Sequence, residues 1–216
     1  MMKKLFCLLV LVLCSCRSVP SEYYVIELDK SEMVNLSYEF QEREEKGNWS
    51  GKWGSSVAEK MNAVIDVLEA DARVKVYKNG TNIGKVIISS KVYNDGGSSI
   101  FKVPYALTLG IISLVGVPLE LVDIRVDMNA KVYDNKGNFI REYNVEESNL
   151  EAVACYYGYS VDEAYITSYA GAYKKALEGI IKNINGDFKE LSIEIGKGKR
   201  NAKKGITYDE MLEALE

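Results

Sequence analysis

The sequence predicts an α+β fold, in which two amphipathic helices pack on one face of a mostly antiparallel sheet. Several segments alternate apolar with polar residues, which is typical of strands with one buried face. Turn sequences such as Asn79-Gly80 link these segments, as in antiparallel hairpins. Two further segments, which begin near Ser56 and Ser160, repeat apolar residues every three or four positions, as helices lying on a sheet do. Hairpin-linked strands covered by helices on one face are typical of the α+β class.

The N-terminal half is expected to contain strands before and after one helix. Tyr23–Leu28 can form a first strand, and apolar residues at the even positions of 34–40 predict a second, half-buried strand. A Ser-x-x-Glu capping box at Ser56 opens a helix of about four turns. Val74–Tyr77 and Gly84–Tyr93 flank the Asn-Gly turn and predict a hairpin. The apolar stripe of the helix comprises Val57, Met61, Val64, Ile65, Leu68 and Ala72.

The C-terminal half contains the clearest strand pattern of the chain. Apolar residues occupy the even positions of 122–132 and polar residues the odd ones, which predicts one buried and one solvated face. The turn Asp134–Gly137 leads back into a strand at 138–145. A second capping box at Ser160 opens a long helix, and residues 188–195 are expected to form a last edge strand. The stripe of the long helix comprises Val161, Tyr165, Tyr169, Tyr173, Ala176, Ile180 and Ile184.

The first residues have the pattern of an export signal. Two lysines in Met1–Lys4 precede an uninterrupted apolar run, Leu5–Leu13. This run is too short for a permanent spanning helix, which needs about 20 apolar residues. Leu13-Cys14-Ser15-Cys16 then resembles the lipobox of bacterial lipoproteins, in which an aliphatic and two small residues precede an invariant cysteine. An ordinary signal peptide with incidental cysteines is the alternative.

The resemblance implies that Cys16 is lipidated. In that family the cysteine thiol carries diacylglycerol, the signal is cut just before the cysteine, and the new amine is usually acylated, with fatty acids such as palmitate. At about 0.8 kcal/mol per buried methylene, two or more chains hold a protein durably on a membrane. Arg17 follows the cysteine where an Asp would mark inner-membrane retention in the enteric members of the family. The resemblance therefore favours the outer membrane over the inner membrane.

Four segments follow from these patterns. Residues 1–15 form the cleaved signal helix and residues 16–22 a lipidated tether. Residues 23–196 form a single α+β domain, and residues 197–216 a basic tail with a short amphipathic segment. In outline, the mature part resembles the small α/β domains of envelope lipoproteins, including auxiliary lipoproteins of secretion and transport systems.

Composition excludes several classes of function. The net charge of −4 becomes −6 once Lys3 and Lys4 leave with the signal, which argues against nucleic acid as a partner. Histidine is absent, so the chain has neither a Ser-His-Asp or Cys-His nucleophile nor imidazole ligands for zinc. Asp123 and Asp127 share one strand face about 13 Å apart, too far for a glycosidase pair at roughly 5–10 Å. We therefore predict no enzyme activity, no cofactor and no metal site.

Two apolar features are candidates for contact with a partner or ligand. Trp49 and Trp53 lie in a polar loop, where they would either cover the core or grip a ligand. Leu109 and Ile112 lie in the uncharged segment 103–119, which we expect inside the domain rather than as an exposed apolar protrusion. A spanning helix is disfavoured there, because two prolines and two glycines would break it.

The sequence thus predicts a non-enzymatic, lipid-anchored cell-envelope protein that binds a partner protein or supports an envelope assembly. The alternative is a lipid- or glycan-handling envelope protein that uses segment 103–119 or the loop with Trp49 and Trp53. The five basic residues within 197–204 are expected to be a solvated tail, with contact to anionic head groups as the alternative.

Overall fold

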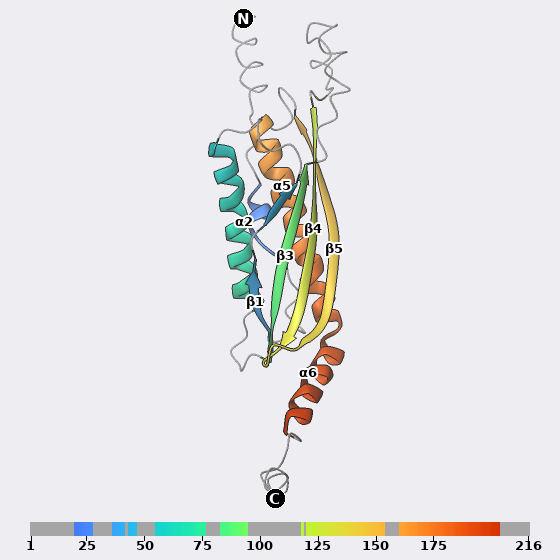
Figure 1. The fold of residues 1–216 in the computed structure, drawn as a ribbon. Helices are drawn as coiled ribbons and strands as arrows, with labels where there is room; N and C mark the ends of the chain where they lie inside the picture. Colours follow the sequence, from blue (N-terminus) through green and yellow to red (C-terminus); the bar gives the residue numbers. More distant parts are fainter. Residues whose placement is uncertain are drawn as a thin grey trace, which may run out of the picture.

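The computed structural model describes residues 20–27, 36–41, 43–46, 55–76, 83–94, 118, 120–153 and 160–203. The predicted α+β class is confirmed, with strands and helices around one core (Figure 1). In chain order the elements are η1 (Ser21–Tyr24), β1 (Leu36–Phe40), β2 (Glu44–Lys46), α2 (Ser55–Val76), β3 (Gly84–Asn94), β4 (Glu120–Asp134), β5 (Phe139–Val153), α5 (Val161–Gly186) and α6 (Phe188–Lys203).

The sheet is mixed, and its longest pairings are antiparallel. Its strand order is β1-β3-β4-β5, and β2 also pairs with β3. β3 with β4 and β4 with β5 are antiparallel, whereas the short strands β1 and β2 run parallel to β3. The turn between β4 and β5 is the predicted one: Asp134 accepts the backbone N–H groups of Lys136 and Asn138, and Gly137 has a φ of 84°. A positive φ is a conformation that glycine adopts without steric cost.

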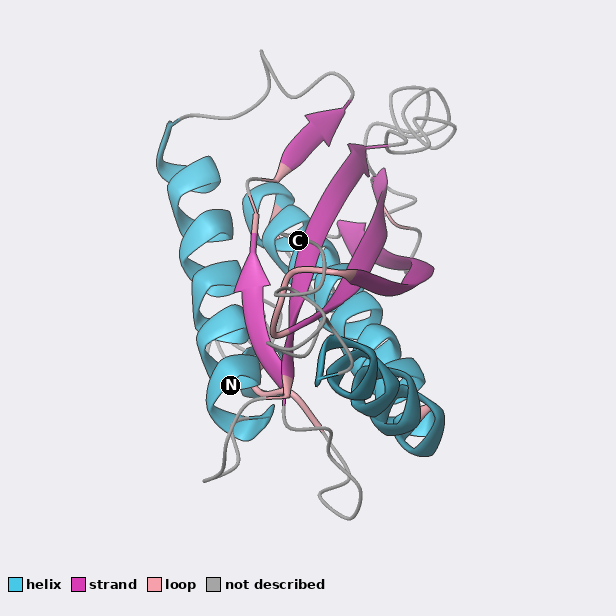
Figure 2. Ribbon diagram, turned by 60° about the horizontal axis from the view of Figure 1, so that its bottom comes forward, coloured by secondary structure: helices cyan, strands magenta, loops and turns pink. Residues whose placement is uncertain are grey.

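One face of the sheet is covered by α2 and α5, and Figure 2 shows these two long helices beside the strands. The even positions of β4 are buried from Val122 to Val132, as the alternating pattern predicts. The stripe of α5 packs on them from Tyr165 onward, and Tyr165, Tyr169 and Tyr173 are fully buried. Val161, the first residue of the predicted stripe, is instead 46% exposed. α5 begins at the predicted cap, where Ser160 and Glu163 exchange hydrogen bonds. None of the helices among the described residues is long and apolar enough to cross a membrane.

The predicted strand at Val74–Tyr77 is wrong for residues 74–76, whereas Tyr77 and the predicted Asn79-Gly80 turn lie outside the described residues. α2 continues through Val76, so the helix has about six turns rather than four. The apolar stripe explains the longer helix, because Leu68 and Ala72 keep their burial at helical spacing up to the last turns. β3 pairs instead with β1 and β4, which are distant in sequence.

The predicted edge strand at 188–195 is also wrong, because these residues form the first half of α6. Leu191 and Ile195 are buried four positions apart, whereas Ile193 between them is 57% exposed. A strand would have buried all three on one face. Arg141 of β5 fixes the helix: its guanidinium binds Asp187 at 2.7 Å, Glu190 at 3.2 Å and Glu194 at 2.8 Å.

The first predicted strand, Tyr23–Leu28, is replaced by a 3-10 turn and an extended stretch. Residues Pro20–Glu27 form a segment that we call the N-terminal strap, which touches both α2 and α5 (Figure 1). Ile26 is fully buried, and its backbone N–H bonds to Asp71 of α2 rather than to another strand. The apolar pattern of the segment therefore reflects its packing on the helices. Leu28 lies outside the described residues.

Candidate binding face

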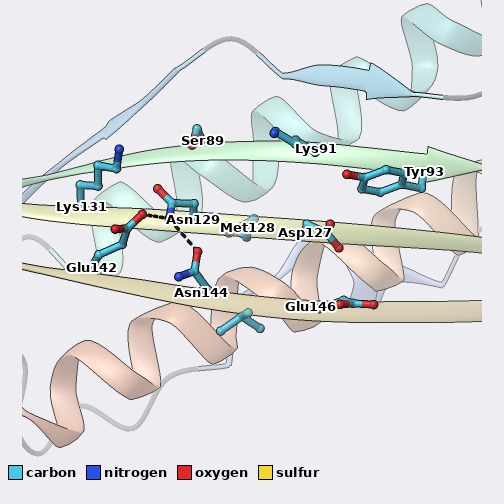
Figure 3. A pocket seen from close by; sticks show the side chains of 11 residues that line it. Ser89, Lys91, Tyr93, Asp127, Met128, Asn129, Lys131, Glu142, Asn144 and Glu146 are labelled. Carbon is cyan, nitrogen blue, oxygen red and sulfur yellow. Dashed lines mark hydrogen bonds between the residues drawn. The ribbon is translucent and has the colours of Figure 1, made fainter.

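The second face of the sheet carries polar side chains from three neighbouring strands. The odd positions of β4 point away from the helices, and polar side chains of β3 and β5 flank them. Together they line a hollow of about 600 Å³ (Figure 3). We call this surface the open face. Its lining residues are Ser89, Lys91, Tyr93, Asp127, Met128, Asn129, Lys131, Glu142, Asn144, Val145 and Glu146.

Strand register brings side chains from three strands together at the centre of the open face. Asn129 pairs with Ser89 on one side and with Asn144 on the other. The Asn129 amide donates hydrogen bonds to Glu142 and, over 2.7 Å, to Asn144 (Figure 3). These bonds orient the amide and carboxylate groups, so that the centre presents polar groups in a fixed arrangement.

Towards the end of β3 the open face is organised around Arg125. Its guanidinium lies 4.6 Å from the centre of the Tyr93 ring and 3.2 Å from Glu146 on β5. Lys91 on β3 lies 3.7 Å from Glu44 on β2. Charges of both signs therefore lie on neighbouring strands of the open face, as in surfaces that select a partner by electrostatic complementarity.

A second hollow of about 550 Å³ lies near the junction of β1, β2 and α2, with Phe40, Arg43 and Glu69 in its wall. Glu69 is only 8% exposed and accepts a 2.7 Å hydrogen bond from the Tyr173 hydroxyl. Arg43 lies 3.7 Å from the same carboxylate and 3.0 Å from Asp66. Burial, together with the Glu69 carboxylate, raises the pKa of Tyr173 well above its usual value. Arg43 and Tyr173 thus compensate the buried Glu69 carboxylate, so this cluster is a structural part of the core.

Asp123 and Asp127 lie on the predicted solvated face of β4, on one strand as expected. Among the described residues, no group of three or more Cys, Asp or Glu side chains could hold a metal ion. The oriented amides, carboxylates and amines are suited to reversible polar binding.

The residues that the sequence singled out lie outside the described part of the chain. This holds for Cys16, Trp49, Trp53, Leu109 and Ile112. The structure instead identifies side chains that the sequence pattern had not selected, such as Tyr93, Asn129 and Asn144. The alternation in 122–132 had indicated a solvated face, but the partners on β3 and β5 depend on strand register.

No family model matches this chain, and no curated protein matches it. Among solved structures, it is similar to a putative neuraminyllactose-binding hemagglutinin homolog from Helicobacter pylori. The two chains share 10% sequence identity with a TM-score of 0.47, and the match covers 84% of this chain and 100% of that chain. A minor lipoprotein from Acinetobacter baumannii is similar over 74% of this chain and 95% of its own, with 8% identity and a TM-score of 0.27. Neither similarity assigns a role to a residue of this chain.

Proposed function

We propose that this chain is a non-enzymatic lipoprotein of the bacterial cell envelope, whose open face binds a partner protein. The observation that carries the proposal is that helices cover only one of the two faces of the sheet among the described residues. One face is covered by α2 and α5, whereas no described element covers the other. Lipid on Cys16 would hold the domain at a membrane, and Arg17 favours the outer membrane.

The size and charge of the open face fit a protein partner. β4 and β5 each have 15 residues, so each strand is about 50 Å long. A face of that length, three strands wide, is compatible with the roughly 800 Å² that each partner contributes to a standard protein interface. Its charges of both signs would provide specificity and register.

In-cell photo-crosslinking tests the proposal. A photoreactive amino acid at Asn129 on the open face should give one defined crosslinked product in intact cells. The same group at Glu59, on the exposed side of α2, is the matched control and should not give that product. Adding Lys131→Glu to the Asn129 variant should weaken the crosslink, because it reverses a charge beside the probe. Equal products at both positions, or none at Asn129, would contradict the proposal.

A second candidate function is the handling of a glycan. The hollow on the open face favours it, because a lining that combines oriented amides, carboxylates and a tyrosine ring suits a sugar with many hydroxyl groups. A lipid- or glycan-handling protein that uses segment 103–119 or Trp49 and Trp53 remains the alternative proposed from the sequence. Glycan or lipid that copurifies with the full-length chain, and that is lost in Asn144→Ala, would favour this second function over a protein partner.

A further inference from the structure

The N-terminal strap joins the candidate anchor directly to the folded domain. The Ile26 backbone N–H donates to Asp71 of α2 over 2.8 Å, and the Glu27 N–H donates to Glu178 of α5 over 2.7 Å. The side chain of Ile26 is buried in the hydrophobic core. The strap is thus attached to both helices, and a chain held in this way does not swing like a flexible tether.

The start of the strap lies at one particular end of the sheet. The Tyr23 hydroxyl contacts Glu151 at 3.5 Å, and Glu151 lies two residues before the end of β5. Lys174 of α5 donates to the Glu22 carbonyl at 2.9 Å. From there the strap follows α5 toward Glu178, away from the first turn of that helix. We call the end of the sheet at Asn94, Glu120 and Val153, where α5 also begins, the near end.

The opposite end, which we call the far end, comprises the β4–β5 turn and α6. Arg141, close to the start of β5, holds α6 there, and α6 extends beyond the sheet in Figure 1. The chain enters the domain beside Glu151, whereas the far end begins at Phe139. Twelve residues of β5 separate these two positions, which is about 40 Å.

Chain length limits where the lipid can be. The seven residues from Cys16 to Tyr23 span at most about 25 Å when fully extended, and less here because Ser21–Tyr24 form a 3-10 turn. This reach covers the near end and falls short of the far end. The direction of the strap also leads back from Glu27 toward the near end.

We infer that the strap holds the domain upright on the lipid surface, with the near end facing the bilayer and the far end pointing away from it. The inference rests on the proposed lipidation of Cys16 and adds an orientation to it. The strands of the open face then run away from the membrane, so that a partner reaches this face from the side. The C-terminal half of α6 then lies beyond the far end and away from the anchoring membrane (Figure 1).

Energy transfer to the bilayer measures this orientation. The full-length chain is matured in cells, purified with its lipid and placed in vesicles of phosphatidylethanolamine and phosphatidylglycerol that carry an acceptor dye on a head group. Cys155, the one cysteine that follows Cys16 in the sequence, is first replaced by Ser so that the dye has a single site. A donor dye is then attached to Asp162→Cys at the near end, or to Lys136→Cys or Ile193→Cys at the far end. These three native side chains are exposed, so labelling leaves the core intact.

The expected result is transfer several-fold stronger from position 162 than from positions 136 and 193. A flexible Gly/Ser insertion of about 20 residues between Ser18 and Val19 is the matched control, because it keeps the lipid and the strap but frees the domain to turn. The difference in energy transfer between position 162 and positions 136 and 193 should then become smaller. Asp71→Ala, which removes the acceptor of the Ile26 N–H, should reduce the difference without removing the lipid.

The experiment distinguishes a failure of the proposed lipid anchor from a failure of the proposed orientation. A chain that incorporates no fatty acid and does not join vesicles would overturn the anchor and the orientation together. A lipidated chain with equal transfer from all three positions, or with stronger transfer from position 136, would overturn the orientation alone. Equal transfer is also the result expected if the helical layer, rather than the near end, lies against the bilayer.

Discussion

Gly171 in α5 allows close contact among the helix, the strap and β5. A methyl group on its Cα would lie 2.7 Å from the Asn149 amide nitrogen and 2.9 Å from the Tyr23 ring. Both neighbours are themselves held, Asn149 by Glu151 and Lys175, and Tyr23 by its contact with Glu151. They therefore cannot move without breaking other bonds.

We expect Gly171→Ala to lower the free energy of unfolding by about 1–3 kcal/mol, because the added methyl overpacks this contact. Gly186→Ala is the matched control: no atom lies within 4 Å of the added methyl at the end of the same helix, and its stability should change by less than about 1 kcal/mol. Urea denaturation of both variants measures the difference. A Gly171→Ala protein as stable as the control would contradict the close packing of the strap.

The pKa of Asp187 illustrates how a single residue ties α6 to the sheet. Hydrogen bonds from Arg141 and from the Tyr143 hydroxyl hold the pKa of this carboxyl below its usual value. Burial and the bond to Asp187 raise the pKa of Tyr143 to about 12. A lowered carboxyl pKa contributes stability above the unfolded value of 3.8 and loses it as the pH falls through the folded value.

Acidification below pH 4 should therefore loosen α6 before it unfolds the sheet. Amide hydrogen exchange of α6 is expected to accelerate at low pH, while that of β4 stays slow. Arg141→Gln should accelerate exchange in α6 already at pH 7, because it removes the cation that three carboxylates share. Exchange in α6 that depends neither on pH nor on Arg141 would show that the apolar contacts of Leu191 and Ile195 hold the helix alone.

At the scale of the element, β4 separates the core from the open face. Val126 is fully buried under the helices, and the next residue, Asp127, lines the hollow on the other side. A shift of the strand register by one residue would exchange these two faces. The buried face of β4 and its polar face thus both depend on the alternation of apolar and polar residues along the strand.

Val126→Asp should destabilise the domain by several kcal/mol, since it would bury an unpaired carboxylate. Asp127→Ala is expected to stay within about 1 kcal/mol, because this half-buried side chain lies on the polar face and not in the apolar core. Thermal melts compare the two variants. Equal melting temperatures would mean that the assigned faces of β4 are incorrect.

At the scale of the whole molecule, the anchor decides where the domain works. Cys16→Ser should abolish metabolic labelling with fatty acid and leave uncut precursor in the membrane fraction, as the lipobox resemblance implies. Cys14→Ser, two residues away, should label and mature normally. A Cys16→Ser chain that still matures and stays bound to the membrane would contradict the lipoprotein proposal.

The sequence by itself determined the class of fold, the buried face of β4 and the stripes of α2 and α5, because these features depend on local periodicity. It also located the turn at Gly137 and the cap at Ser160, where local hydrogen bonding defines the structure. Only the tertiary structure decided that residues 23–27 form no strand and that residues 188–195 are a helix. The reason is that their short apolar patterns suit several conformations, and distant partners, namely Asp71, Glu178 and Arg141, select one. The open face was decided in the same way, since the register of three strands brings Asn129 to Asn144 and Arg125 to Tyr93.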